Sequence, residues 1–385
     1  MDVPLLSSFP NAICSYLLRT TSDHSPMVIE FKMDPFSYGP SPFRFQQMWV
    51  DHPQFLMCVR QAWSATVVGH GLTKLAVKLK NTKVALQEWN KHIFGRTTMH
   101  ITSLESHIEE LESKLHQSWD ETMERDLLVS SSELDIWLRR EDTRLAQISK
   151  LKWHMEGDWN TNFFHACLAN KRRKRVVDMR CSNGMVFNSL ESLHQGAVDF
   201  FSNFLQGVPT RLLPDLSTLI SPVISDSDSS ILCSVPTMNE VFSALSSIPS
   251  NSAPGPNGFG SGFFKSYLEV VKEDVLEAIS QFFISKQLPR FFTTSFLVSI
   301  PKFDNPYGFD KFRPISLCSV FYKICSKIIV TGLLPQMILC EQGAFISGRN
   351  IFENISITKE MVQSINKKAH DGNIMIKLDM AKAYD

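Results

Sequence analysis

The last ten residues of the chain, IKLDMAKAYD (Ile376–Asp385), carry its most informative pattern. The mostly apolar stretch Ile374–Leu378 (IMIKL) predicts a continuous β-strand, and Asp379 follows it directly. An aspartate at the end of a buried strand can offer its carboxylate to Mg²⁺, which takes one or two protein carboxylates. Taken alone, the pattern is short enough to arise by chance, and an ordinary strand with an acidic turn is the simpler interpretation.

Four segments upstream add to this pattern. In chain order they are NSAPGPNGF (Asn251–Phe259), VSIPKFDNP (Val298–Pro306), FRPISL (Phe312–Leu317) and EQGAFISGRN (Glu341–Asn350). Together with the last ten residues, and in this order, they resemble the reverse transcriptase of LINE-type (non-long-terminal-repeat) retrotransposons of the plant-like kind. The resemblance implies the fingers and an incomplete palm of a right-hand, RNA-directed DNA polymerase.

The resemblance also implies roles for single residues. Asp379 matches the first catalytic aspartate, a Mg²⁺ ligand, and Tyr384 matches the aromatic residue below the incoming sugar. Lys302 and Arg313 match residues that contact the triphosphate, and an ammonium and a forked guanidinium both suit phosphate oxygens. On its own, Arg313 would be interpreted as a surface arginine before a proline. Three further residues match a segment near the template and the nucleotide: Gln342, Gly348 and Arg349.

Two features farther upstream indicate contact with nucleic acid. WNTNFFH (Trp159–His165) and the run KRRKR (Lys171–Arg175) resemble the region between endonuclease and polymerase in plant elements. Consecutive cations form a footprint for phosphates, and nearby aromatic rings can stack on bases. A solvated surface or an import signal explains such a run equally well. The candidate residues are Trp159, Phe163, Phe164, Lys171, Arg172, Arg173, Lys174 and Arg175.

The segment TTSDHSP (Thr20–Pro26) resembles the last motif of the exonuclease–endonuclease–phosphatase fold. The resemblance implies that His24 acts as a base on the scissile phosphate and that Asp23 orients it. The metal-binding residues of that fold lie far upstream of this motif in the family. We therefore expect residues 1–34 to be a C-terminal remnant in which Asp23 and His24 are relics.

The family's second palm motif, an aromatic-Ala-Asp-Asp turn, is expected many residues beyond Asp385, and no Asp-Asp dipeptide occurs in this chain. A two-metal site cannot close without these carboxylates. The resemblance therefore predicts an incomplete Mg²⁺ site and a chain that is inactive on its own. Departures from the family pattern at Asn257, Thr331–Gly332 and Ser347 agree with relaxed selection.

Three hypotheses follow from these patterns. The chain is a truncated, inactive relic of a reverse transcriptase, a nucleic-acid-binding protein without catalysis, or a fragment of a longer, active polyprotein. The family resemblance implies an RNA template and a DNA primer as partners. The sequence does not indicate an oligomeric state.

We expect an α+β fold in four parts: a mostly helical linker leads to fingers and an incomplete palm. The expected parts are the endonuclease remnant (1–34), a loop with a helical linker (35–155), a basic and aromatic hairpin region (156–235) and the N-terminal part of a reverse transcriptase domain (236–385).

Composition limits the class of protein further. The chain has 39 basic and 39 acidic residues, so its net charge does not indicate a nucleic-acid partner. Its eight cysteines are scattered, which is typical of reduced thiols inside the cell. Neither a signal peptide nor an apolar run of about 18–20 residues is visible, so we expect a soluble protein of the nucleus or cytoplasm.

Local patterns predict individual elements. Residues 35–48 should form a loop and 52–155 helices. An apolar stripe within 52–155 predicts an antiparallel helical hairpin, the stripe being Ile101, Leu104, Ile108, Leu111 and Leu115, extended by Trp119, Met123 and Leu127.

In the second half of the chain, Asn183-Gly184 predicts a tight turn in a β-hairpin over 175–188. The Ser-rich stretch 221–230 is expected to be a surface loop. Thr237 and Glu240 predict a capping box, followed by helices over 265–285 and from Ser319 onward.

Overall fold

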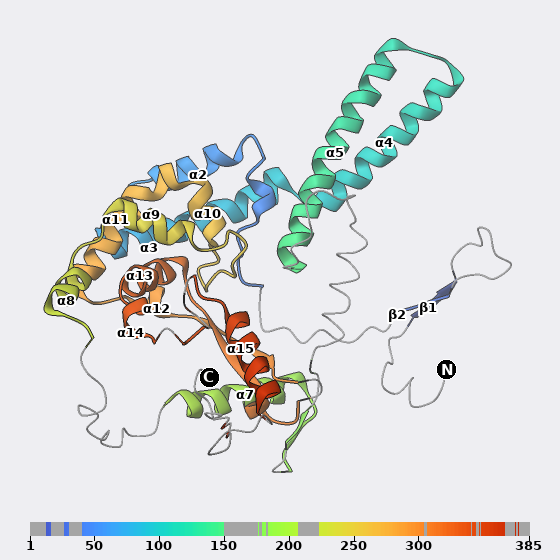
Figure 1. Cartoon of the computed structure of the whole chain (residues 1–385). Coiled ribbons are helices and arrows are strands. Elements are labelled where there is room, and N and C mark those ends of the chain that lie inside the picture. The colour runs from blue at the N-terminus through green and yellow to red at the C-terminus, as the bar shows by residue number, and fades with distance from the viewer. Residues whose placement is uncertain are drawn as a thin grey trace.

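The computed structural model describes residues 13–16, 27–30, 41–149, 176, 179–181, 184–206, 223–303, 306–339, 341–343, 346, 348–365, 374 and 376. They form a helical body, a long helical arm that projects from it, and three two-stranded antiparallel sheets (Figure 1). The described part of the chain is thus an α+β structure dominated by helices. In these ranges no helix is both long and apolar enough to cross a membrane.

One hydrophobic core holds the body together. It combines apolar side chains of the segment 43–94 with those of the segment 241–325, and Trp137 of the arm reaches it. The expected divisions at 35–155 and 236–385 stay predictions, but these two segments do not have separate cores. The helices of the body are α2 (Phe55–Ser64), α3 (Gly71–Trp89), α9 (Met238–Ser246), α10 (Ser261–Ser266), α11 (Leu268–Ser285), α12 (Arg290–Thr293) and α13 (Val320–Thr331), with the short turns η1 (Gln47–Trp49) and η2 (Asn90–Phe94).

Hydroxyl side chains start two of these helices where the sequence predicts them. Thr237 Oγ1 accepts a hydrogen bond from the backbone N–H of Glu240, and Glu240 Oε2 accepts one from the backbone N–H of Thr237 at 2.8 Å. Ser319 Oγ accepts from the N–H of Tyr322 at 3.2 Å and starts α13. Each cap satisfies an N–H group that has no partner within its own helix.

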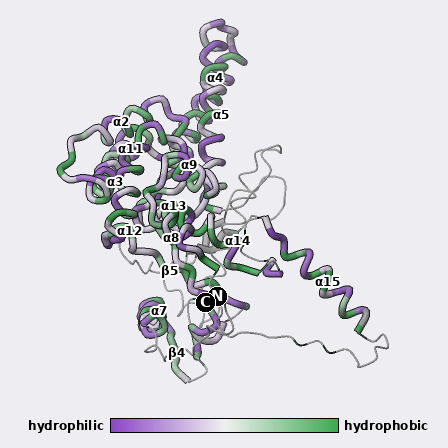
Figure 2. The backbone as a smooth tube through the Cα atoms, turned by 60° about the vertical axis from the view of Figure 1, so that its left-hand side comes forward, coloured by the Kyte–Doolittle hydropathy of each residue, from purple (hydrophilic) through white to green (hydrophobic). Residues whose placement is uncertain are grey.

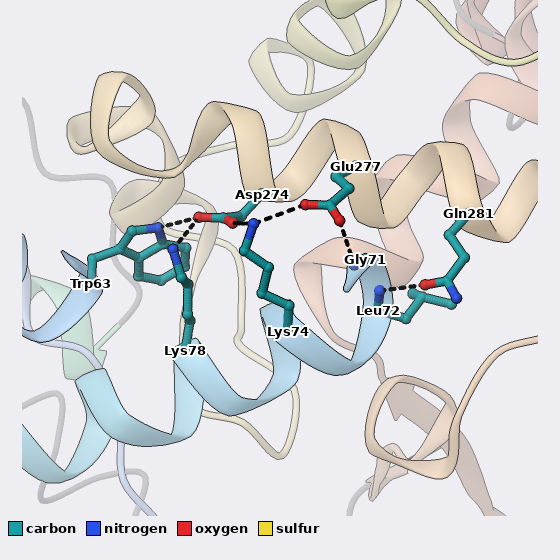
Figure 3. Close-up of polar contacts among 8 residues, drawn as sticks. All are labelled: Trp63, Gly71, Leu72, Lys74, Lys78, Asp274, Glu277 and Gln281. Carbon is teal, nitrogen blue, oxygen red and sulfur yellow. Dashed lines mark hydrogen bonds and ion pairs between the residues drawn. The ribbon is translucent and has the colours of Figure 1, made fainter. Parts of the chain in front are cut away.

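The interface between α3 and α11 contains a buried charge network (Figure 3). Asp274 of α11 is buried, and its carboxylate accepts hydrogen bonds from Trp63 Nε1 at 2.7 Å and Lys78 Nζ at 2.8 Å. Lys74 Nζ lies 2.9 Å from the other carboxylate oxygen. Burial opposes ionisation of Asp274, but the hydrogen bonds from Lys78, Lys74 and Trp63 outweigh it, and the pKa is lowered. The carboxylate therefore stays ionised although it is largely buried.

Side chains of α11 also cap the start of α3. His70, the residue before α3, makes no side-chain cap. Instead, Glu277 accepts from the N–H of Gly71 at 2.8 Å, and Gln281 accepts from the N–H of Leu72 at 2.6 Å (Figure 3). The Gly71 bond, and then Lys74, lower the pKa of Glu277. A carboxylate at a helix N-terminus is stabilising, so α11 fixes both the position and the first turn of α3.

The arm consists of α4 (Thr97–Gln117) and α5 (Glu121–Ser149), which pack antiparallel as predicted (Figure 1). Leu111 of the predicted stripe is buried, but Trp119 does not extend the stripe and is 69% exposed. The reason is local: α4 ends at Gln117, and Asp120 accepts hydrogen bonds from the N–H groups of Thr122 and Met123, which starts α5.

The three small sheets are hairpins. β1 (Ile13–Tyr16) pairs with β2 (Met27–Glu30), β3 (Met179–Arg180) with β4 (Val186–Phe187), and β5 (Phe296–Pro301) with β6 (Phe312–Leu317). The turn between β3 and β4 contains Gly184 at φ +83°, which confirms the hairpin predicted from Asn183-Gly184. The helix α7 (Leu190–Leu205) follows it.

Three local predictions were wrong or incomplete. The stretch 221–230 is not only loop, because α8 (Asp226–Cys233) begins in it, with Ser225 and Asp228 forming a reciprocal capping box. Serine and aspartate weaken helix interiors but favour first turns, so this composition marks a helix start. The helix expected from 265 breaks at Tyr267 (φ −120°, ψ 27°). Of the strand predicted at Ile374–Leu378, the structure describes two isoleucines, both exposed and outside any strand.

Replacing Asp274 with Asn should destabilise the body, because Lys78 would keep a charge at a largely buried position without its carboxylate. Removing one partner of a buried pair costs about 3–5 kcal/mol. We expect the lower end of this range, since Lys74 is 30% exposed and keeps its ion pair with Glu277.

The contribution of Asp274 should depend on pH. Because its pKa is lowered in the folded chain, the stabilisation is complete above the unfolded pKa of about 3.9 and is lost as pH falls through the folded pKa. Urea denaturation at neutral and acidic pH measures both effects.

Glu269→Gln is a matched control on the same helix. Glu269 pairs with Lys272 at 2.6 Å, but the carboxylate is 80% exposed and solvent screens the pair. Stability should hardly change. If Asp274→Asn were as stable as this control, the α3–α11 interface would not depend on the buried carboxylate.

Candidate nucleic-acid interface

The β5–β6 hairpin brings two of the predicted phosphate-binding residues to one face. Ile300 lies opposite Arg313, and Pro301 lies opposite Phe312. The pairing continues one residue further, because the N–H of Lys302 donates to the carbonyl of Lys311 at 2.9 Å. Directly opposed residues in an antiparallel pair share a face, and so do residues two apart along one strand. Lys302, Lys311 and Arg313 therefore form one basic face.

The second face of the hairpin attaches it to a small hydrophobic cluster. Phe312 alternates with Arg313 and is buried together with Phe309, Phe201 of α7 and Met179 of β3. Lys302 and Arg313, in contrast, are exposed. The exposed aliphatic side chains Val298, Ile300 and Ile315 lie on the same face as the cations. The hairpin thus packs through Phe312 on one face and presents the other face, both charged and apolar, to solvent.

The third member of the basic face is engaged within the chain. Lys311 Nζ lies 2.7 Å from Asp310 Oδ2 and 5.4 Å from the centre of the Tyr307 ring. The hydrogen bond and charge of Asp310 raise the pKa of Lys311. Lys311 and Asp310 were not among the predicted site residues. Lys311 can be identified only once the register is known, because alternation along the paired segments then puts it on the same face as Lys302 and Arg313.

Charge is distributed unevenly along the neutral chain. The arm, Thr97–Ser149, contains 12 of the 39 acidic residues but only 5 of the 39 basic ones. The rest of the chain therefore carries 27 acidic and 34 basic residues. A net charge of zero thus hides an acidic arm and an otherwise basic chain, and it does not argue against a polyanionic partner.

Arg349 has a structural role in the segment 341–350. Its guanidinium donates to the backbone carbonyls of Leu339, Gln342 at 3.1 Å and Ile338 at 3.1 Å, just beyond α14 (Leu334–Met337). Gly348 has φ +80°, and a Cβ there would meet nothing within 4 Å. The contacts predicted between nucleotide and Gln342, Gly348 or Arg349 stay predictions.

The helix α15 (Ile351–Ser364) follows this segment and stands away from the body (Figure 2). Asn350 starts it by accepting a hydrogen bond from the N–H of Phe352 at 2.9 Å. Its apolar side chains are exposed, among them Ile351, Phe352 and Met361. The helix is tied to the preceding segment by Asn354, whose Nδ2 donates to the carbonyl of Glu341 at 2.7 Å.

The loop Asn251–Phe259 joins distant parts of the body. The carbonyl of Gly258 accepts a hydrogen bond from the N–H of Phe45 at 2.9 Å, and Lys323 Nζ of α13 donates to the carbonyl of Ala253 at 2.8 Å. Asn257 lies in this loop, at a position where the reverse transcriptases that the sequence resembles usually have aspartate. Its Oδ1 accepts from the N–H of Phe259 at 3.2 Å, and its buried Nδ2 has no hydrogen-bond partner among the described residues. An aspartate would supply the same acceptor without the unpaired N–H.

The remaining predicted site residues lie outside the described ranges. They are Asp379, Tyr384, Asp23, His24, Trp159, Phe163, Phe164, Lys171, Arg172, Arg173, Lys174 and Arg175. Within the described ranges, no three His, Cys, Asp or Glu residues are grouped so that they could hold a metal ion. The expected Mg²⁺ site therefore depends entirely on residues such as Asp379 whose surroundings are not described.

Comparison with known proteins supports the origin of the chain. It is 23% identical over 380 residues to the Transposon TX1 uncharacterized 149 kDa protein of Xenopus laevis. The alignment covers 96% of this chain and 29% of that protein, so the chain spans less than a third of its relative's length. No family model matches the chain. The similarity supports an origin in a non-long-terminal-repeat retrotransposon.

Gly258→Ala should destabilise the body strongly. Gly258 has φ +82°, and a Cβ there would lie 2.2 Å from the carbonyl oxygen of Phe43. Backbone strain and overpacking together should cost about 2–4 kcal/mol. Gly184→Ala is the matched control, because Gly184 has φ +83° but nothing within 4 Å of the added Cβ. It should cost about 1–2 kcal/mol from strain alone. Equal losses in thermal denaturation would show that the loop is not packed against Phe43.

Proposed function

We propose that this chain contains the fingers and the first part of the palm of a LINE-type, plant-like reverse transcriptase. In this proposal its basic face binds phosphate groups of the RNA template, the DNA primer or the incoming nucleotide. The single observation that carries the proposal is the strand register. It places Lys302 and Arg313, the two residues matched to triphosphate contacts, on one exposed face. The similarity to a transposon protein supports the same proposal.

The chemistry of this face fits a nucleotide or a nucleic acid. The guanidinium of Arg313 can donate two parallel hydrogen bonds to phosphate oxygens, and the ammonium of Lys302 adds a compact point charge. The neighbouring side chains of Val298 and Ile300 offer apolar surface beside these charges. A ligand with anionic phosphates next to flat, weakly polar rings matches both parts of the face.

We propose binding, and not polymerisation, as the activity of these 385 residues by themselves. Bound Mg²⁺ would activate the primer hydroxyl and stabilise the leaving pyrophosphate. The sequence supplies Asp379 as one candidate ligand but no Asp-Asp dipeptide. The described residues add no metal-binding cluster. Nucleic-acid binding without catalysis is therefore the second candidate function, and it rests on the same basic face.

The double variant Lys302→Ala/Arg313→Ala should weaken binding to a fluorescein-labelled RNA–DNA duplex in fluorescence anisotropy. Each lost phosphate contact should reduce the slope of log affinity against log salt by about 1, so the double variant should lose about 2. Arg60→Ala/Lys80→Ala removes the same charge from exposed positions on α2 and α3. The proposal fails if both double variants reduce affinity and slope equally.

The purified chain should not extend a DNA primer on an RNA template in Mg²⁺, because one aspartate cannot hold the two metal ions of nucleotidyl transfer. Incorporation of a labelled nucleotide measures this directly. Extension that is abolished by Asp379→Asn would contradict the expectation and would assign catalysis to this chain.

A further inference from the structure

The two lysines of the basic face oppose each other directly. Lys302 follows β5 and Lys311 precedes β6, the 2.9 Å backbone hydrogen bond joins them, and Arg313 lies two residues from Lys311. Like charges at directly opposed positions destabilise a strand pair. Negative charge, from the chain or from a ligand, would therefore stabilise a hairpin that keeps three cations at one end of one face.

The chain supplies one such charge through Asp310. This residue lies in the turn η3 (Phe309–Lys311), where it follows Phe309, which is buried, and precedes Lys311. A Cβ at Gly308 would lie 2.7 Å from Asp310 Oδ1, so glycine at this position leaves room for the carboxylate. Two features thus hold Asp310 beside the ammonium of Lys311: Phe309 is packed in the hydrophobic cluster, and Gly308 has no side chain that would collide with the carboxylate.

The ion pair that results is accessible and replaceable. The side chain of Asp310 is 51% exposed and that of Lys311 is 31% exposed. Exposed ion pairs contribute little net stability, because water solvates both partners well when they separate. Lys311 also rests near the Tyr307 ring, which gives the ammonium a second contact that does not depend on Asp310.

We propose that Asp310 is an internal competitor for phosphate at the basic face. Without ligand, Asp310 neutralises Lys311. A phosphate group displaces the carboxylate, and Lys311 joins Lys302 and Arg313 as a third phosphate-binding cation. The inference rests on the proposed function, and it adds a residue that binds and a residue that limits binding. Weakly charged anions do not compete with the carboxylate, so Asp310 makes the face selective for ligands that concentrate negative charge.

A double-mutant cycle on the full chain tests this exchange, with the labelled RNA–DNA duplex at low salt as probe. Asp310→Asn should tighten binding about threefold, and Lys311→Ala should weaken it by a similar factor. In the Lys311→Ala background, Asp310→Asn should have no further effect, because the competitor has lost its target. Both sites are at the surface, and unchanged thermal denaturation confirms that the variants fold.

The alternative is that Asp310 repels the duplex only through its charge. Asp310→Asn would then tighten binding equally with and without Lys311, and the inference would be overturned. This failure differs from failure of the proposed function, in which Lys302→Ala/Arg313→Ala binds as well as the unaltered chain.

Competition with inorganic triphosphate identifies the source of the phosphate. If triphosphate displaces the duplex and does so less well from Lys311→Ala, the three cations bind a nucleotide triphosphate. If the cycle shows coupling but triphosphate does not compete, they bind backbone phosphates of the duplex. Both results support the exchange of Asp310 for phosphate.

Discussion

The carboxylate of Asp274 receives hydrogen bonds from an indole and an ammonium and lies beside a second ammonium. A buried charge with this many partners is tolerated, whereas the same carboxylate without them would make the α3–α11 interface unstable. Trp63 and Asp274 are 211 residues apart in sequence, so this one group joins the first and second halves of the body. Glu277 and Gln281 of the same helix cap the start of α3, so polar contacts add to the hydrophobic core in joining the two helices.

This interface changes how the segments of the chain are understood. Residues 43–94 resemble a linker in sequence, but they supply much of the core on which the loop Asn251–Phe259 and α13 rest. That loop bonds Phe45 on one side and Lys323 on the other. The β5–β6 hairpin is fastened separately, through Phe312 and the cluster around Phe201. The basic face is therefore presented by a small module beside a body that depends on the supposed linker.

Local chemistry decided which features could be predicted from sequence. The capping box at Thr237, the start of α13 at Ser319 and the turn at Gly184 each depend on residues within a few positions, and all were predicted. The same logic applies at Ser225, but serine and aspartate also suit loops, so the sequence does not distinguish a helix start from a loop there. The bonds of Asp274 and the carbonyl contacts of Arg349 depend on residues brought together by folding, and no sequence spacing reveals them.

The basic face lies between these cases, because it follows from sequence once one register is known. Pro301 and Pro314 have no N–H, and they pair with Phe312 and Ser299. Since the N–H of Lys302 donates to the carbonyl of Lys311, alternation puts both prolines at positions that need no hydrogen bond across the strands. If β6 slipped by one residue along β5, a proline would stand where an N–H must donate. Arg313 would then move to the buried face of the hairpin, which Phe312 occupies in this register. The two prolines thus oppose a one-residue slip, and the observed register is what brings Arg313 and the two lysines together on the solvent side.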